Sequence, residues 1–154
     1  MDGKAAIAQS RAIERYLAKQ FNLAGKSDVE AAQVDMWTEH VRDVQDKYQK
    51  AKASKDAECE DPVAKWFKDD LPGLLAKLDK VAALTSTTPG CAVGDDLTLA
   101  DIKIWMMVCD YFDAKDVVLA AVKEKAPRLA AIVEKVANHE SLKAWLATRP
   151  VTPF

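Results

Sequence analysis

The residues best placed to do chemistry are two neighbours near the start of the chain, Gln9 and Ser10. A serine at a helix start can offer its hydroxyl and backbone N–H groups to an anion, and the helix dipole favours a carboxylate there. The neighbouring glutamine adds a neutral donor and a neutral acceptor. The pair could therefore hold the carboxylate of an amino acid, although an ordinary N-cap beside a surface glutamine explains the same dipeptide.

Helical periodicity dominates the elements that must position this pair. Apolar residues recur at steps of three and four after Ser10 and again from Asp28 to about Lys52, with a break at residues 22–27. Asp61 followed by Pro62 predicts another helix start, and Pro72 predicts a kink or restart in that helix. Residues 85–90, rich in Ser, Thr, Pro and Gly, predict a loop.

A capping motif opens the second half of the chain. Thr98 with Asp101 three residues later forms an Asp version of the capping box, and Leu97 can pack across the first turn onto Ile102. Thr98→Ala should cost about 1 to 2 kcal/mol of stability and Asp101→Ala somewhat less. The helix that follows, to about residue 112, is apolar on nearly every side. Two further helices are expected, over about residues 116–125 and 127–147.

Composition bounds the class of protein. The chain has 154 residues, 49% hydrophobic and 30% charged, which fits one globular domain. A net charge of −2 and a pI near 5.7 give no basic field for nucleic acid or for an anionic membrane, so neither partner is expected. Cys59, Cys91 and Cys109 are odd in number and widely spaced, which favours a reducing cytoplasmic location. No signal peptide or spanning helix is evident.

These motifs resemble the glutathione S-transferase family, most closely its sigma branch and the related alpha, mu and pi branches. The Asp-Gly turn at residues 2–3, the Gln-Ser pair and the helix Ala-Ile-Glu-Arg-Tyr-Leu-Ala at residues 12–18 are similar to those closing the family's thioredoxin-like half. The resemblance implies an all-α bundle, the family's C-terminal domain, at residues 26–154. It implies that residues 1–25 are a remnant of the thioredoxin-like domain, with its last strand and last helix.

The resemblance also implies roles for particular residues. Gln9 and Ser10 match the pair that binds the γ-glutamyl end of glutathione, and Asp43 matches a carboxylate that reaches glutathione on a neighbouring subunit. The helix Asp28–Lys52 would then line a homodimer interface, although Asp43 also fits a solvated acidic face. Some sigma-type members bind a cation on this helix. Because Arg42 stands between the matching acids here, no metal site is predicted, and no cofactor is expected.

The chain offers no match to the catalytic tyrosine of the family's first strand. Conjugation needs a donor near the glutathione sulfur because the thiolate is the nucleophile. We therefore expect glutathione conjugation and detoxification only as part of a longer protein, and inactivity with weak or absent glutathione binding in these 154 residues. The chain would be a truncated gene model or a natural remnant. The alternative is a non-enzymatic helical module for protein interaction or structure, and an unrelated ligand-carrying bundle is a third reading.

Overall fold

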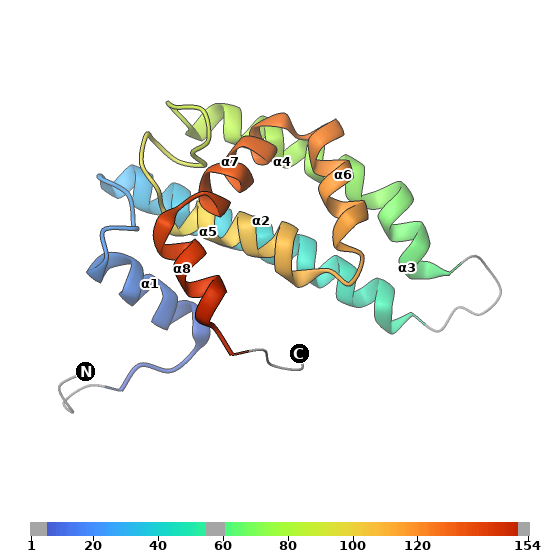
Figure 1. The fold of residues 1–154 in the computed structure, drawn as a ribbon, viewed down its shortest axis with the longest axis horizontal. Helices are drawn as coiled ribbons and strands as arrows, with labels where there is room; N and C mark the ends of the chain where they lie inside the picture. The colour runs from blue at the N-terminus through green and yellow to red at the C-terminus, as the bar shows by residue number, and fades with distance from the viewer. Residues whose placement is uncertain (1–5, 55–60, 151–154) are drawn as a thin grey trace.

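The protein is described by a computed structural model that covers residues 6–54 and 61–150 (Figure 1). Every regular element within these two ranges is helical, which confirms the predicted all-α class. The elements are α1 Ser10–Gln20, α2 Asp28–Ala53, α3 Pro62–Lys65, η1 Trp66–Asp70, α4 Leu71–Thr85, α5 Leu99–Met106, η2 Met107–Tyr111, α6 Lys115–Lys125, α7 Pro127–Ala137 and α8 Glu140–Thr148, where η marks a π-helical turn.

Short polar side chains begin several of these helices, and the one at Asp61 was predicted from the sequence. Ser27 Oγ accepts a hydrogen bond from the Glu30 N–H (3.2 Å) at the start of α2. Asp61 accepts from the Val63 N–H (3.0 Å), and Pro62 opens α3. The restart predicted at Pro72 is also present, because the π-helical turn η1 separates α3 from α4. Proline lacks the N–H that would continue the regular ladder there.

Helix α5 lies at the centre of the bundle and packs against α2 and α7 (Figure 1). Ile104 is fully buried on it, but Met106 is 43% exposed, so α5 is less enclosed than the sequence suggested. The Trp37 indole N–H donates to Thr85 Oγ1 (3.2 Å) and ties α2 to α4 inside this core. The largest fully buried side chains are those of Trp37, Tyr48, Phe112, Leu71, Leu75, Ile104, Met107, Leu129 and Ile132.

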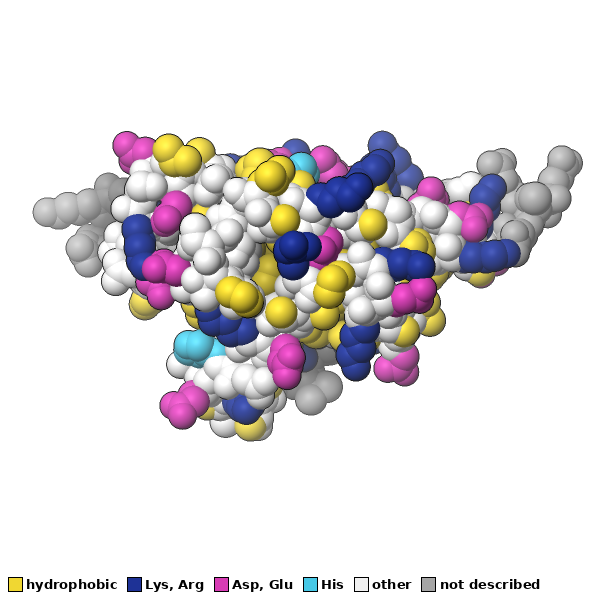
Figure 2. Space-filling model, turned by 90° about the horizontal axis from the view of Figure 1, so that it is seen from above, with side chains coloured by type: hydrophobic (Ala, Val, Ile, Leu, Met, Phe, Trp, Pro, Cys, Tyr) yellow, Lys and Arg dark blue, Asp and Glu magenta, His cyan; other side chains and the backbone are white. Residues whose placement is uncertain are grey.

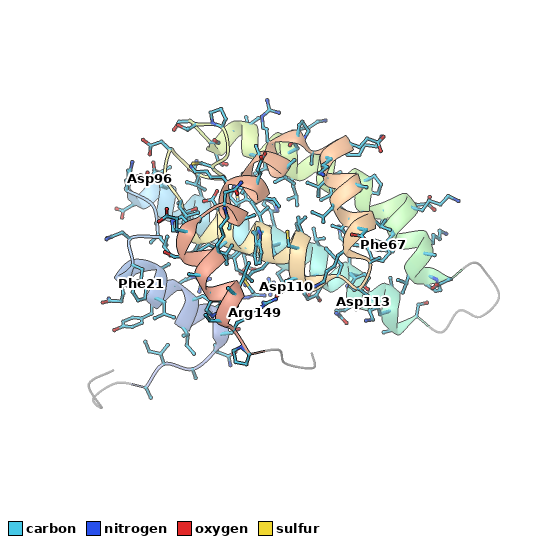
Figure 3. All side chains as sticks on the ribbon, in the orientation of Figure 1. Phe21, Phe67, Asp96, Asp110, Asp113 and Arg149 are labelled. Carbon is cyan, nitrogen blue, oxygen red and sulfur yellow. The ribbon has the colours of Figure 1, made fainter. Side chains whose placement is uncertain are left out.

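The C-terminal helix predicted over residues 127–147 is two helices, so that prediction was wrong. Asn138 ends α7, and His139 has extended backbone (ψ 126°) before α8 begins. Asn and His are weak helix formers, and α8 buries none of its residues, so packing does not enforce one continuous helix. Arg149 instead holds α8 beside Asp110 (both contacts 3.3 Å; Figure 3). That hydrogen-bonded guanidinium lowers the pKa of Asp110.

The start of the described chain carries no strand. Residues 6–8 have no regular structure, while the predicted strand remnant falls largely on residues 1–5, outside the described ranges. Helix α1 buries only Ala18, whereas its apolar residues Tyr16, Leu17 and Phe21 are 39, 41 and 67% exposed. The apolar stripe of α1 therefore faces outward. None of the helices within residues 6–54 and 61–150 is long and apolar enough to cross a membrane.

Candidate functional site

The candidate site stands at the N-terminal end of α1. Gln9 is the N-cap of this helix and Ser10 its first residue, one position later than an ordinary serine cap would require. Gln9 has φ 74° and ψ 121°, a conformation that residues other than glycine rarely adopt. Holding a non-glycine residue in such a region costs about 1 to 3 kcal/mol, and such strain clusters at binding sites.

The first backbone donors of α1 have no acceptor within the helix. The first helical hydrogen bond runs from the Ile13 N–H to the Gln9 carbonyl (3.1 Å), so the N–H groups of Ser10, Arg11 and Ala12 come before the ladder. Gln9 and Ser10 are exposed, and neither side chain caps the helix. Three backbone donors, a hydroxyl and an amide are thus available to one anion of carboxylate size.

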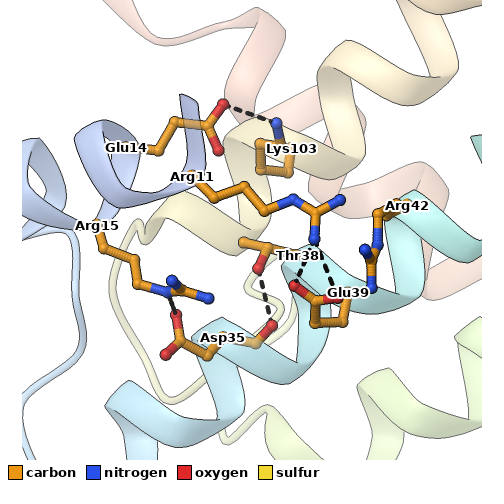
Figure 4. A network of polar contacts seen from close by, with 8 residues as sticks. All are labelled: Arg11, Glu14, Arg15, Asp35, Thr38, Glu39, Arg42 and Lys103. Carbon is orange, nitrogen blue, oxygen red and sulfur yellow. Dashed lines mark hydrogen bonds and ion pairs between the residues drawn. The ribbon is translucent and has the colours of Figure 1, made fainter. Parts of the chain in front are cut away.

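A polar network behind the pair fixes α1 against α2 and α5 (Figure 4). Arg11 Nη1 donates to both carboxylate oxygens of Glu39 on α2, at 2.9 and 3.2 Å. One turn later the Arg15 Nε donates to Asp35 (2.8 Å). On the other side of α1, Lys103 of α5 binds Glu14 (3.0 Å), and this pair is the most buried of the three.

The three acidic residues of α2 that the sequence analysis or the network with α1 involves, Asp35, Glu39 and Asp43, differ in their partners. Asp35 and Glu39 are committed to arginines of α1, and Glu39 also accepts from Arg42. Asp43 is exposed, and within the described ranges no hydrogen bond or ion pair joins it to Gln9 or Ser10. Arg42, which stands between Glu39 and Asp43 in the sequence, forms an ion pair with Glu39. No cluster of three or more potential metal ligands is present in residues 6–54 and 61–150.

Two of the three tyrosine hydroxyls, those of Tyr48 and Tyr111, form hydrogen bonds within the bundle, whereas Tyr16 is exposed on α1. Tyr48 is buried and donates to Asp113 (2.9 Å), and Tyr111 accepts from Gln49 (2.8 Å). Burial is the main cause that raises the pKa of Tyr48, with the hydrogen bond to Asp113 acting in the same direction. Tyr48 also packs between the two π-helical turns, against Trp66 (ring centroids 5.0 Å apart) and Phe112 (5.0 Å). Its hydroxyl is therefore part of the core.

The sequence indicated Gln9 and Ser10 as candidates but gave no sign of the contacts around them. A positive φ at Gln9 could not be predicted from the residue type, since glycine or asparagine usually occupies such a backbone conformation. The ion pairs of Arg11 and Arg15 join residues 28 and 20 positions apart. Their spacing of four on α1 matches the spacing of Asp35 and Glu39 on α2, which was the one signal that could have paired the two helices.

The surface seen in Figure 2 carries basic, acidic and hydrophobic side chains interspersed, with no gathering of one charge sign on that face. The arrangement is that of an all-α bundle whose first helix begins with an exposed start that no side chain caps.

Comparison with known proteins agrees with this architecture. The family model for the C-terminal domain of glutathione S-transferases matches residues 42–149. The probable glutathione S-transferase 7 of Caenorhabditis elegans is 36% identical over all of this chain and 73% of its own length. A structure of monomeric Na-GST-3, a glutathione S-transferase of Necator americanus, superimposes with a TM-score of 0.79 at 29% identity, covering this whole chain and 74% of that one.

A third relative is named as a crystallin and not as a transferase. S-crystallin SL11 of Nototodarus sloanii is 27% identical over this whole chain and 73% of its own length. The extent of the family match and the nematode relative together place the chain in its class. The chain belongs to the glutathione S-transferase family.

Proposed function

We propose that Gln9 and Ser10 bind the γ-glutamyl end of glutathione and that the chain serves glutathione conjugation as one part of a complete site. The observation that carries this proposal is the strained backbone of Gln9 (φ 74°) beside an uncapped helix N-terminus. Because no side chain caps α1, the N–H groups of its first turn have no helical partner. The network of Arg11 and Arg15 keeps α1 fixed on α2, so the donors are held in place before any ligand arrives.

In this proposal residues 1–25 belong to the thioredoxin-like part of a transferase and residues 26–154 to its helical domain. The outward apolar stripe of Tyr16, Leu17 and Phe21 supports the division, because a helix with such a stripe is built to pack against further structure. Tyr48 and Tyr111 hydroxyls are committed within the core and its edge. Because no residue of the chain matches the family's catalytic tyrosine, we propose that a longer protein supplies the donor that favours the glutathione thiolate, and the 154-residue chain by itself should not catalyse.

Glutathione should bind to the 154-residue chain no more tightly than millimolar, because one carboxylate contact offsets little of the ordering cost of the ligand. Titration followed by amide NMR should move the Ser10 and Arg11 signals with glutathione and γ-glutamylcysteine, but not with cysteinylglycine. Ser10→Ala should remove these shifts. Ser27→Ala, which deletes the cap of α2, is the matched control and should leave them intact.

A second substitution tests whether the backbone strain at Gln9 serves glutathione binding at the expense of stability. Gln9→Gly should raise the unfolding free energy by about 1 kcal/mol, because glycine adopts a positive φ without penalty, and should weaken glutathione binding. Equal shifts with cysteinylglycine, or unchanged binding in Ser10→Ala, would refute the assignment. Conjugation of a standard electrophile above the uncatalysed rate would show that the chain supplies its own donor.

The helix Asp28–Lys52 is proposed as the centre of a homodimer interface, with Asp43 directed to glutathione on the partner. A groove with a volume of about 470 Å³ between α1 and α2, lined by residues that include Tyr16, Ala32 and Asp35, supports this. Val29→Asp, at an exposed valine of α2, should shift the chain to monomer in light scattering after gel filtration. Val117→Asp, at a half-exposed valine of α6, should not. A wild-type chain that is monomeric at high concentration would contradict the dimer.

The S-crystallin relative favours one second candidate, a non-enzymatic structural or interaction module. Such a module needs the bundle but not the anion site. If Ser10→Ala and Gln9→Gly leave glutathione binding unaffected in a chain extended by a thioredoxin-like half, the structural reading is preferred.

A further inference from the structure

A thiol and an amine from distant parts of the chain lie in direct contact on the face of the bundle away from α1. Lys135 Nζ is 2.7 Å from Cys91 Sγ, although the two residues are 44 positions apart. Cys91 belongs to the loop between α4 and α5 and is 2% exposed, whereas Lys135 is an exposed residue of α7. A buried thiol is thus covered by the end of a surface lysine.

The loop backbone holds the two groups together. Gly90 has φ +81°, and a Cβ there would stand 3.2 Å from Lys135 Cδ, so the lysine stem lies against the bare glycine. Thr87 N–H donates to the Gly94 carbonyl (2.8 Å) and the Cys91 N–H to the Thr88 carbonyl (3.2 Å), which closes the loop around the thiol. No carboxylate lies within ion-pair distance of Lys135 in the described ranges.

Small oxidants have a route to this contact. A cavity of about 220 Å³ opens beside the loop and is lined by Cys91 together with Ser86, Thr88 and Arg128. Water and hydroperoxides are small enough to enter such a space. Cys109, in contrast, is half-buried, and no lysine amine lies within hydrogen-bond distance of its sulfur in the described part of the chain.

We propose that Cys91 and Lys135 form an oxidation-sensitive pair that a hydroperoxide converts into a sulfenamide crosslink. The thiol sulfur attacks one hydroperoxide oxygen, the O–O bond breaks, and the products are a sulfenic acid at Cys91 and water or an alcohol. The Lys135 nitrogen then attacks that sulfur. An S–N bond forms, the sulfenic hydroxyl leaves as water, and the protons of the ammonium pass to the leaving hydroxyl and to solvent. Sulfur is oxidised by two electrons, and the hydroperoxide is reduced by two.

The crosslink would join the α4–α5 loop to α7. The next residue of the loop, Ala92, donates its N–H to Asp101 (2.6 Å) at the start of α5, so the bond also fixes the entry to the central helix. Closing a covalent loop of this length reduces the freedom of the unfolded chain. The oxidised protein should therefore melt at a higher temperature than the reduced protein, and a thiol reductant should reverse the change.

The test uses the full 154-residue chain with Cys59→Ser, which leaves Cys91 and Cys109 as its thiols. After hydrogen peroxide treatment, peptide mass spectrometry should find the peptides of Cys91 and Lys135 joined with the loss of two hydrogen atoms. Dithiothreitol should separate them. The melting temperature should rise by roughly 5 °C or more on oxidation and return on reduction.

The matched control is Lys135→Arg, which keeps a long cationic side chain but has no amine able to form the bond. In this variant Cys91 should stop at the sulfenic acid, which dimedone traps, and the melting temperature should not rise. Cys91→Ala should abolish both products. Sulfenic or sulfinic acid at Cys91 with an unmodified Lys135 in the parent chain, or an unreactive Cys91, would overturn the proposal.

Discussion

Replacing Asp101 with alanine should lower the unfolding free energy by about 3 to 5 kcal/mol, a large effect for one exchange. Asp101 is fully buried and accepts three hydrogen bonds, from the Thr98 N–H (2.7 Å), the Thr98 hydroxyl (2.7 Å) and the Ala92 N–H (2.6 Å). Alanine leaves all three donors without an acceptor inside the protein. Urea unfolding with two probes, fluorescence and circular dichroism, measures the loss.

Two variants calibrate this prediction. Thr98→Ala should cost about 1 to 2 kcal/mol, because it removes a cap but keeps the carboxylate bonded to two backbone N–H groups. Asp101→Asn should fall between the two alanine variants, since its single carbonyl oxygen can serve only part of the donor set. A cost for Asp101→Ala equal to or below that of Thr98→Ala would contradict the assignment and restore the order expected from the sequence.

The pH dependence of this carboxyl has a defined sign. Burial raises the pKa of Asp101, although the donors from Thr98 and Ala92 act in the opposite direction. The folded chain therefore binds a proton at Asp101 more tightly than the unfolded chain does. Lowering the pH through that raised pKa favours the folded state, so acid unfolding must start elsewhere. Asp110 has a pKa lowered by Arg149, and its contribution is lost as the pH falls through that lowered value.

Thr98 and Asp101 show what can be predicted from sequence and what cannot. Their spacing of three predicted a capping box, and the structure confirms it, because a cap is formed by residues that are close in the chain. The Ala92 N–H reaches the same carboxylate from outside the motif, across a loop of nine positions. The sequence contains no pattern for that bond, and this is why it ranked Thr98 above Asp101.

The helix boundaries likewise could be predicted where local residues set them and not where tertiary packing does. Local signals predicted the starts of α3 and α5 at Asp61 and Thr98, whereas the cap of α2 at Ser27 was not singled out. The break between α7 and α8 was missed, since apolar periodicity continues across Asn138 and His139 while no residue of α8 becomes fully buried. At the candidate site, residue types indicated Gln9 and Ser10. Their strained backbone and the arginines that fix α1 depend on the tertiary structure.

Asp79 is the residue that sequence reasoning passed over altogether, and its replacement by alanine should cost about 2 to 4 kcal/mol. It lies in α4 and is 7% exposed, yet it caps α7, 49 positions later in the chain. Asp79 Oδ1 accepts from the N–H groups of Arg128 (2.6 Å) and Leu129 (3.3 Å), and Oδ2 accepts from Arg128 Nη1 (3.1 Å). The negative charge of Asp79 also interacts favourably with the helix dipole at the N-terminus of α7.

The parts of this interaction can be separated by a variant series. Arg128→Ala removes only the ion pair, and because that side chain is 57% exposed the loss should stay below about 1 kcal/mol. Asp79→Asn keeps an acceptor for the backbone N–H groups and should cost less than Asp79→Ala. Amide exchange at Arg128 and Leu129 should accelerate in both Asp79 variants and stay unchanged at Glu30, whose cap on α2 is independent. Equal losses in Asp79→Ala and Arg128→Ala would mean that the surface ion pair, not the cap, joins α4 to α7.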